Sequence, residues 1–109
     1  MPVGYTLRFK TRVGREQDFQ QFLLHMIEVV KANDAGCLHY ELYRSVDEPQ
    51  RFSFFEQWAS ENDLKAHAAK PHFKEFAKMR EMLEEGPEVI KHAGQSNVRA
   101  SPEGTPSPA

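Results

Sequence analysis

The sequence has little cysteine, little excess of charge of either sign and no long hydrophobic run. Its 109 residues include a single cysteine, Cys37, which cannot form an internal disulfide, so we expect a reducing, cytoplasmic location. The formal net charge is −2, without a block of lysine or arginine, which argues against nucleic acid or an anionic membrane as the main partner. No apolar run approaches the ~20 residues that span a bilayer. The N-terminus also lacks the apolar core of a signal peptide.

Hydrophobic periodicity divides the first half of the chain into a strand, a helix and a hairpin. Residues 3–10 alternate apolar and polar side chains, as in a half-buried strand. From Arg15 the period becomes helical, and Gly36 can take the left-handed conformation that often follows a helix. Two alternating runs, Cys37–Ser45 and Arg51–Trp58, flank a turn and predict an antiparallel hairpin. The predicted inward stripe of the helix is Phe19, Phe22, Leu23, Met26, Ile27 and Val30.

The second half predicts a helix in two pieces and a final strand. Ser60 is placed as an N-cap with Asp63 three residues later, and Pro71 is placed as the first residue of the second piece. We expect Gly86-Pro87 to end this piece and a short strand to follow at residues 88–93. The predicted inward positions are Leu64 and Ala68 in the first piece, then Phe73, Phe76, Ala77, Arg80 and Leu83 in the second.

This order of elements predicts an α+β fold of the ferredoxin-like split βαβ type, an antiparallel sheet with helices on one face. A turn centred near Glu48 would set Trp58 opposite Leu38, and Glu56 opposite Tyr40. The domain is expected to occupy residues 1–94. The Ser-, Pro- and Gly-rich residues 95–109 are expected to form a disordered tail.

The sheet face without helices carries Tyr43 and Phe55 beside the stems of Arg8 and Lys10. A single domain would leave that apolar surface and the sheet edges in water. We therefore predict a two-fold homodimer with the sheets packed face to face.

Residues 36–76 hold the only tryptophan and most of the phenylalanines and histidines, so a pocket is expected there. Glu56 shares a strand face with Phe54 and Trp58, and a carboxylate among aromatic rings is unfavourable unless it is paired or protonated. It is therefore either a proton acceptor for a substrate hydroxyl or the partner of a basic residue such as Arg80.

The other candidates supply aromatic walls and proton-transfer groups. We predict Glu56, Trp58 and His67 as catalytic residues, and each also has a structural alternative in the core. His67 and His72 are five positions apart with a proline between them, which is not the ligand spacing of a helical metal site, and we predict neither metal nor cofactor. His72 could instead bond to backbone at its helix start. The predicted substrate-binding residues are Tyr40, Phe54, His72 and Phe76.

Three short motifs resemble the antibiotic biosynthesis monooxygenase domain family, over about Val3 to Ala93. They are G-C-x-x-Y-E from Gly36, E-x-W from Glu56, and A-H followed by P-H-F from Pro71. The resemblance implies a dimeric α+β barrel. Family members include cofactor-free oxygenases of quinols or polyketide phenols, enzymes that process an autoinducer signal, and haem-degrading enzymes. In polyketide-oxidising members, a tryptophan placed like Trp58 resembles a pocket wall.

The haem-degrading branch does not fit, because its members carry Trp, His and Asn where this chain has His67, Ala77 and Leu7. The resemblance therefore implies a cofactor-independent monooxygenase, similar to quinol monooxygenases, that oxidises a small phenolic or quinol-like substrate with O₂. Two alternatives stay open. One is an isomerase or degrading enzyme for a small hydroxy-carbonyl signal, and the other is a non-catalytic ligand-binding stress protein.

Overall fold

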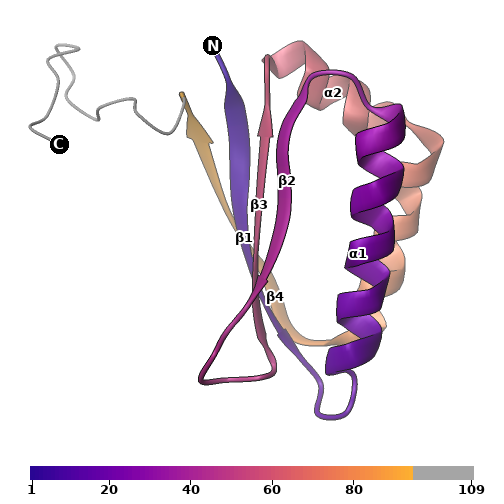
Figure 1. Ribbon diagram of the computed structural model, residues 1–109, viewed down its shortest axis with the longest axis vertical. Helices are drawn as coiled ribbons and strands as arrows, with labels where there is room; N and C mark the ends of the chain where they lie inside the picture. Colours follow the sequence, from indigo (N-terminus) through magenta and orange to yellow (C-terminus); the bar gives the residue numbers. More distant parts are fainter. Residues whose placement is uncertain (95–109) are drawn as a thin grey trace, which may run out of the picture.

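A four-stranded antiparallel sheet forms one layer of the protein, and helices cover one of its faces (Figure 1). The computed structural model describes residues 1–94, so the tail predicted at residues 95–109 lies outside the described part. The sheet order β2-β3-β1-β4 confirms the ferredoxin-like α+β prediction. The elements are β1 (Val3–Thr11), α1 (Glu16–Asn33), β2 (Cys37–Arg44), β3 (Arg51–Trp58), α2 (Glu61–Ala69), the 3₁₀ helix η1 (Pro71–Met82) and β4 (Leu83–Ala93).

The core lies between the sheet and the helices, with α1 contributing its buried stripe. Phe19 is fully buried and packs its ring 5.2 Å from Phe9 of β1 and 5.0 Å from Phe52 of β3. Leu23 and Val30 continue the same buried stripe, as the helical period predicted. Gly36 has φ 81°, the left-handed value expected where the chain leaves α1 and turns into β2.

The hairpin register is correct in the middle and wrong at one end. Tyr40 lies opposite Glu56 as predicted, but Trp58 lies opposite Cys37 rather than Leu38. The pairing is irregular between Cys37 and His39, so an extra residue enters β2 there. Leu38, which was predicted to lie opposite Trp58, falls at this irregularity and is exposed.

Helix η1 differs from the predicted second helical piece. The prediction assumed 3.6 residues per turn and placed Ala77 and Arg80 inward, but both are exposed. With three residues per turn, positions three apart align along one side. Phe76 and Met79 are accordingly half-buried and Met82 is buried.

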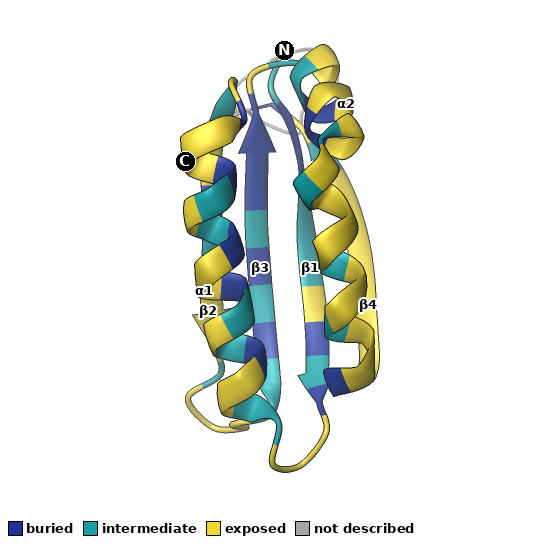
Figure 2. Ribbon diagram, turned by 90° about the vertical axis from the view of Figure 1, so that its right-hand side faces the viewer, coloured by how far each residue is buried: buried dark blue, intermediate teal, exposed yellow. Residues whose placement is uncertain are grey.

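Strand β4 is longer than predicted and lies beyond the helical layer. It begins at Leu83 rather than at residue 88, and the Gly86-Pro87 step falls inside it, where its pairing with β1 is irregular. Figure 2 shows β3 in view between the helices, with α1 on the side of β2 and α2 on the side of β1 and β4, and with exposed residues along most of β4. In residues 1–94, no helix has both the length and the apolar composition needed to cross a membrane.

The start of α2 offers a direct test of the local structure. The Asp63 backbone N–H donates to Ser60 Oγ at 3.1 Å, so Ser60 caps the helix as predicted. Ser60→Ala should lower the free energy of unfolding by about 1 kcal/mol in denaturant titrations. Asn62→Ala, an exposed position in the same turn, serves as the control. Equal stability of the two variants would contradict the capping role.

Candidate active site

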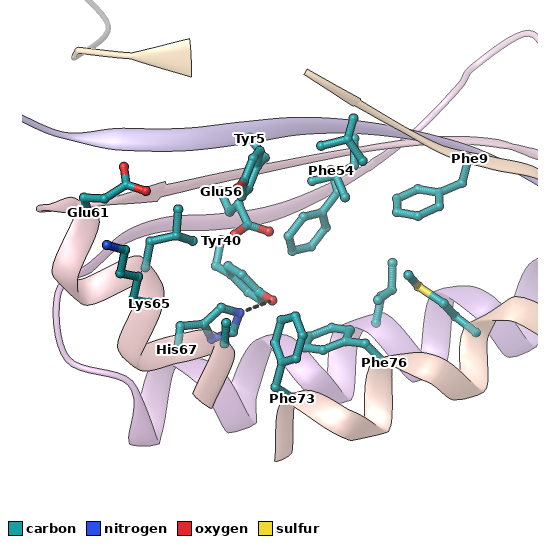
Figure 3. A pocket seen from close by; sticks show the side chains of 16 residues that line it. Tyr5, Phe9, Tyr40, Phe54, Glu56, Glu61, Lys65, His67, Phe73 and Phe76 are labelled. Carbon is teal, nitrogen blue, oxygen red and sulfur yellow. Dashed lines mark hydrogen bonds between the residues drawn. The ribbon is translucent and has the colours of Figure 1, made fainter. Parts of the chain in front are cut away.

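A cavity of about 390 Å³ lies between the sheet and the helices, and its lining is mostly apolar (Figure 3). Its size falls in the range that takes a small organic ligand. Tyr40, Glu56 and His67 bring polar atoms to one part of the wall. The remaining lining residues are Tyr5, Leu7, Phe9, Leu23, Phe54, Glu61, Leu64, Lys65, Ala68, Phe73, Phe76, Met79 and Val89.

Glu56 is the buried carboxyl group of this cavity. Burial raises the pKa of Glu56 from 4.5 to about 7, and a hydrogen bond donated by Trp58 opposes the rise. That bond runs from Trp58 Nε1 to Glu56 Oε1 at 3.0 Å. The predicted ion pair with Arg80 is wrong, because Arg80 is exposed on η1. A carboxyl group with a pKa near neutrality can both take and return a proton.

Trp58 supports the cavity from behind and is absent from its lining. The side chain is fully buried, and its ring stacks on the His67 ring with centroids 4.4 Å apart. The prediction of Trp58 as a pocket wall therefore differs from its observed place. Trp58 thus contacts Glu56 through its N–H and His67 through its ring face.

His67 comes from α2 and lines the cavity together with Ala68, the predicted inward position. His67 is buried and Ala68 is exposed. Burial lowers the pKa of His67, while Asp34 acts in the opposite direction. Its Nε2 atom lies 3.5 Å from the Tyr40 hydroxyl.

Tyr40 links the imidazole of His67 to the aromatic part of the cavity. Burial, together with the nearby Glu56 carboxylate, raises the pKa of the Tyr40 phenol. The hydroxyl therefore stays protonated and can donate a hydrogen bond. The ring meets Phe54 edge-on, with centroids 4.6 Å apart. Phe54 and Phe76 line the cavity where the sequence had predicted substrate-binding residues.

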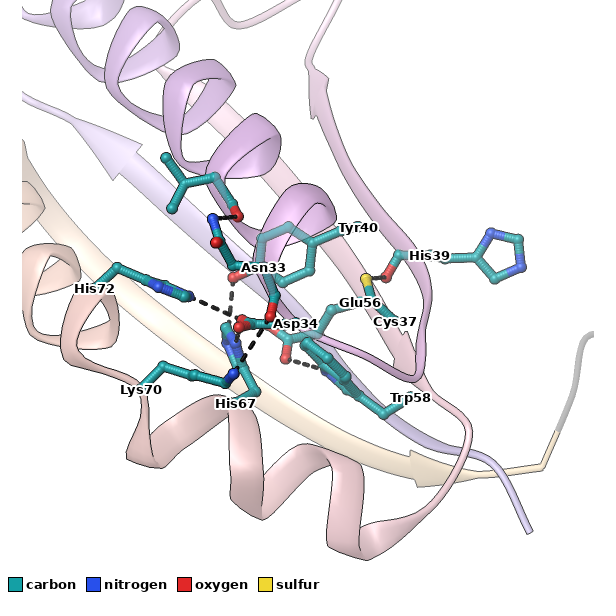
Figure 4. Close-up of polar contacts among 11 residues, drawn as sticks. Asn33, Asp34, Cys37, His39, Tyr40, Glu56, Trp58, His67, Lys70 and His72 are labelled. Atoms are coloured by element: carbon teal, nitrogen blue, oxygen red, sulfur yellow. Dashed lines mark hydrogen bonds and ion pairs between the residues drawn. The ribbon is translucent and has the colours of Figure 1, made fainter.

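Asp34 and His72 form a polar cluster with His67 next to the cavity (Figure 4). His67 Nδ1 lies 2.5 Å and His72 Nε2 lies 2.9 Å from the same oxygen, Asp34 Oδ2. His72 had been predicted to contact substrate or backbone, but it bonds to the Asp34 side chain and is absent from the cavity lining.

Sequence reasoning missed Asp34. The residue follows α1 directly and reads as part of a turn, yet its side chain is only 1% exposed. No local pattern in the sequence indicated this role, because Asp34 makes its side-chain contacts with His67 and His72, which lie in a distant part of the chain. Lys70 Nζ donates to the Asn33 carbonyl at 3.3 Å and helps to hold these two ends together.

The cluster also contains the residue types of a metal site. The candidate ligand atoms of Asp34, His67 and His72 lie within 4.8 Å of one another, although their sequence spacing did not suggest it. Two ligands on one zinc ion, each bound at about 2.0–2.2 Å, would be separated by ~3.3 Å. The 2.5 Å separation between His67 Nδ1 and Asp34 Oδ2 is that of a hydrogen bond. A metal ion would require these groups to move apart.

Comparison with known proteins agrees with this fold. The family model for antibiotic biosynthesis monooxygenase matches residues 2–79. A solved structure from Caulobacter crescentus CB15, provisionally assigned to that family, is 28% identical, with 86% of this chain and 90% of that chain covered and a TM-score of 0.80. Rv0793 from Mycobacterium tuberculosis is 27% identical, with coverages of 93% and 100% and a TM-score of 0.74. No curated protein matches the sequence.

Proposed function

Because this chain belongs to the antibiotic biosynthesis monooxygenase family, we propose that it is a cofactor-independent monooxygenase that oxidises a small phenolic or quinol-like substrate with O₂. One observation carries the proposal: the buried Glu56 carboxyl, with a pKa of about 7, faces an apolar cavity of about 390 Å³. Family membership alone would not assign the reaction.

The proposed reaction begins with loss of the phenolic proton to Glu56. The electron-rich anion passes an electron to O₂, and the two radicals combine to give a peroxide at a ring carbon that carries hydrogen. Removal of that hydrogen as a proton, with cleavage of the O–O bond, leaves a carbonyl. One oxygen atom stays in the product, and the other leaves as water with the two substrate protons.

The proposed reaction needs two proton acceptors, and the cavity offers two. Glu56 can take the hydroxyl proton and return it to the leaving oxygen, since its pKa lies near neutrality. His67 can take the proton from carbon, with its Nε2 atom beside the Tyr40 hydroxyl. The apolar walls, Phe54 and Phe76 among them, would hold the ring and exclude water from the radical pair.

The protein is proposed to work as a homodimer through the sheet face opposite the helices. Phe55 on this face stacks on His92 with centroids 5.4 Å apart and also contacts His39. Tyr43 is 56% exposed and Ile90 is 47% exposed. An aromatic and aliphatic surface of this kind supports the packing of a second copy about a two-fold axis.

Oxygen uptake tests the proposed function. Metal-free protein incubated with a panel of dihydroxy aromatics should consume O₂ faster than buffer with at least one of them, and the rate should saturate with substrate. No uptake above the buffer rate across the panel would contradict the oxygenase. Turnover of a hydroxy-carbonyl compound under nitrogen would favour the isomerase alternative. Tight binding with no product by mass spectrometry would favour a binding role.

A further inference from the structure

We propose that Asp34 and His72 are positioning residues for His67. Asp34 fixes the His67 proton on Nδ1, so that the Nε2 lone pair faces the cavity wall at Tyr40, and His72 supports Asp34. As an account of catalysis this rests on the proposed function, because it makes His67 a working base. The placement of the proton does not depend on any substrate.

The tautomer follows from the chemistry of the contact. An ionised carboxylate accepts hydrogen bonds and cannot donate them. The 2.5 Å approach of His67 Nδ1 to Asp34 Oδ2 therefore requires the hydrogen to be on Nδ1. A neutral imidazole carries one N–H, so Nε2 is left as an acceptor. The Tyr40 hydroxyl lies 3.5 Å from this acceptor at the cavity wall.

The surroundings hold the imidazole in this orientation. The His67 and Asp34 side chains are 2% and 1% exposed, so water does not compete for the bond. Trp58 stacks on one face of the ring and Phe73 meets it edge-on at 5.2 Å. The Asp34 backbone is fixed as well, because its N–H donates to the Val30 carbonyl at 2.8 Å.

His72 completes the arrangement from the solvent side. Its side chain is 18% exposed, and its Nε2 lies 2.9 Å from the oxygen that binds His67. Within the described residues, the second carboxylate oxygen, Asp34 Oδ1, is buried and has no hydrogen-bond partner. A buried carboxylate with one unpaired oxygen needs strong hydrogen-bond donors on the other oxygen. The N–H groups of His67 and His72 supply them at Asp34 Oδ2.

The arrangement would assist the reaction when His67 takes a proton. Its Nε2 atom becomes N–H, and the ring becomes a buried imidazolium ion. Asp34 stabilises that positive charge at hydrogen-bonding distance, as a carboxylate does for the histidine of a hydrolase triad. His72 contacts the same oxygen at 2.9 Å and adds a second imidazole N–H to that carboxylate.

Nuclear magnetic resonance of the unmodified protein tests the inference without a substrate. Nitrogen-15 shifts of the two ring nitrogens distinguish the tautomers of a neutral histidine. At pH 8 we expect His67 to show a protonated Nδ1 and an unprotonated Nε2. A His67 signal with the proton on Nε2 would overturn the inference.

Two variants extend the test. Asp34→Asn should abolish the preference for the Nδ1–H tautomer, whereas Glu75→Gln, an exposed carboxylate on η1 paired with Lys78, should leave it unchanged. If Asp34→Asn does not fold, His72→Gln provides the second variant, because it removes only the more exposed donor. In that variant the His67 tautomer should persist and the pH at which His67 is protonated should change. An unchanged protonation curve would contradict the role of His72.

Activity measurements separate this inference from the proposed function. With an aromatic that the wild type oxidises, Asp34→Asn should lower kcat roughly a hundredfold and leave KM nearly unchanged. Equal kcat values would overturn the positioning role even if the oxygenase is real. The expected tautomer in a protein that oxidises no member of the panel would contradict the proposed function and leave the assigned proton position intact.

Discussion

Glu56→Gln should make the protein more stable at pH 8 and remove the proposed oxygenase activity. Folding raises the pKa of Glu56 from 4.5 to about 7, so the folded state holds this proton more tightly than the unfolded state. Stability is therefore lost as the pH rises from 4.5 through 7, and the loss is complete above that range. At ~1.4 kcal/mol per pKa unit, the ionised group costs the folded protein roughly 3 kcal/mol.

The neutral amide avoids this cost and can still accept the N–H of Trp58. Denaturant unfolding at pH 8 should therefore show a gain of up to roughly 3 kcal/mol for Glu56→Gln, shrinking toward zero near pH 4. Oxygen uptake by the variant should fall at least roughly a hundredfold. The exposed substitution Glu75→Gln should change neither quantity. A variant less stable than the wild type at pH 8 would contradict this prediction, because it would show that the folded protein stabilises the ionised Glu56 carboxylate.

Phe55→Asp should dissociate the proposed homodimer. Phe55 lies on the helix-free face between the rings of His39 and His92, and a two-fold axis would bring two copies of it into the contact. Burial of each phenylalanine side chain is worth ~1.5–3 kcal/mol, and an unpaired carboxylate at the contact adds a desolvation cost. The dissociation constant should therefore rise by at least roughly a hundredfold.

Sedimentation velocity at micromolar concentration would measure this effect. The wild type should sediment as a dimer, and Phe55→Asp should sediment as a monomer or fail to fold. Phe55→Leu keeps an apolar side chain at the same position and should remain dimeric. A monomeric wild type, or a Phe55→Asp protein that stays dimeric, would show that this face is not the contact between copies.

Much of the fold could be predicted because simple periods determine it. The apolar stripe of α1 and the alternation of apolar and polar residues in β1 and β3 predict which side chains face the core. Phe19, Phe9 and Phe52 are buried as these patterns predict. Local chemistry also identified the Ser60 cap and the exit at Gly36. The errors occur where the period changes without a sequence marker, as in η1 and at the bulge after Cys37.

The candidate site was predictable in part for the same reason. Tyr40, Phe54 and Glu56 lie at alternate positions of paired strands, so their common face follows from the strand pattern. Asp34 and His72 meet through the tertiary packing of two helix ends, which the local pattern does not encode. His67 was identified as a candidate, but its carboxylate partner was not.

The proposed function is that the cavity beside Glu56 lets this protein oxidise a phenolic ring with O₂ and no cofactor. The most direct test is the mass of the product formed by metal-free protein under ¹⁸O₂. On this proposal, one ¹⁸O atom enters the product and the other leaves as water, and Glu56→Gln yields almost no labelled product. A product that carries no ¹⁸O, or equal labelling with Glu56→Gln, would contradict it.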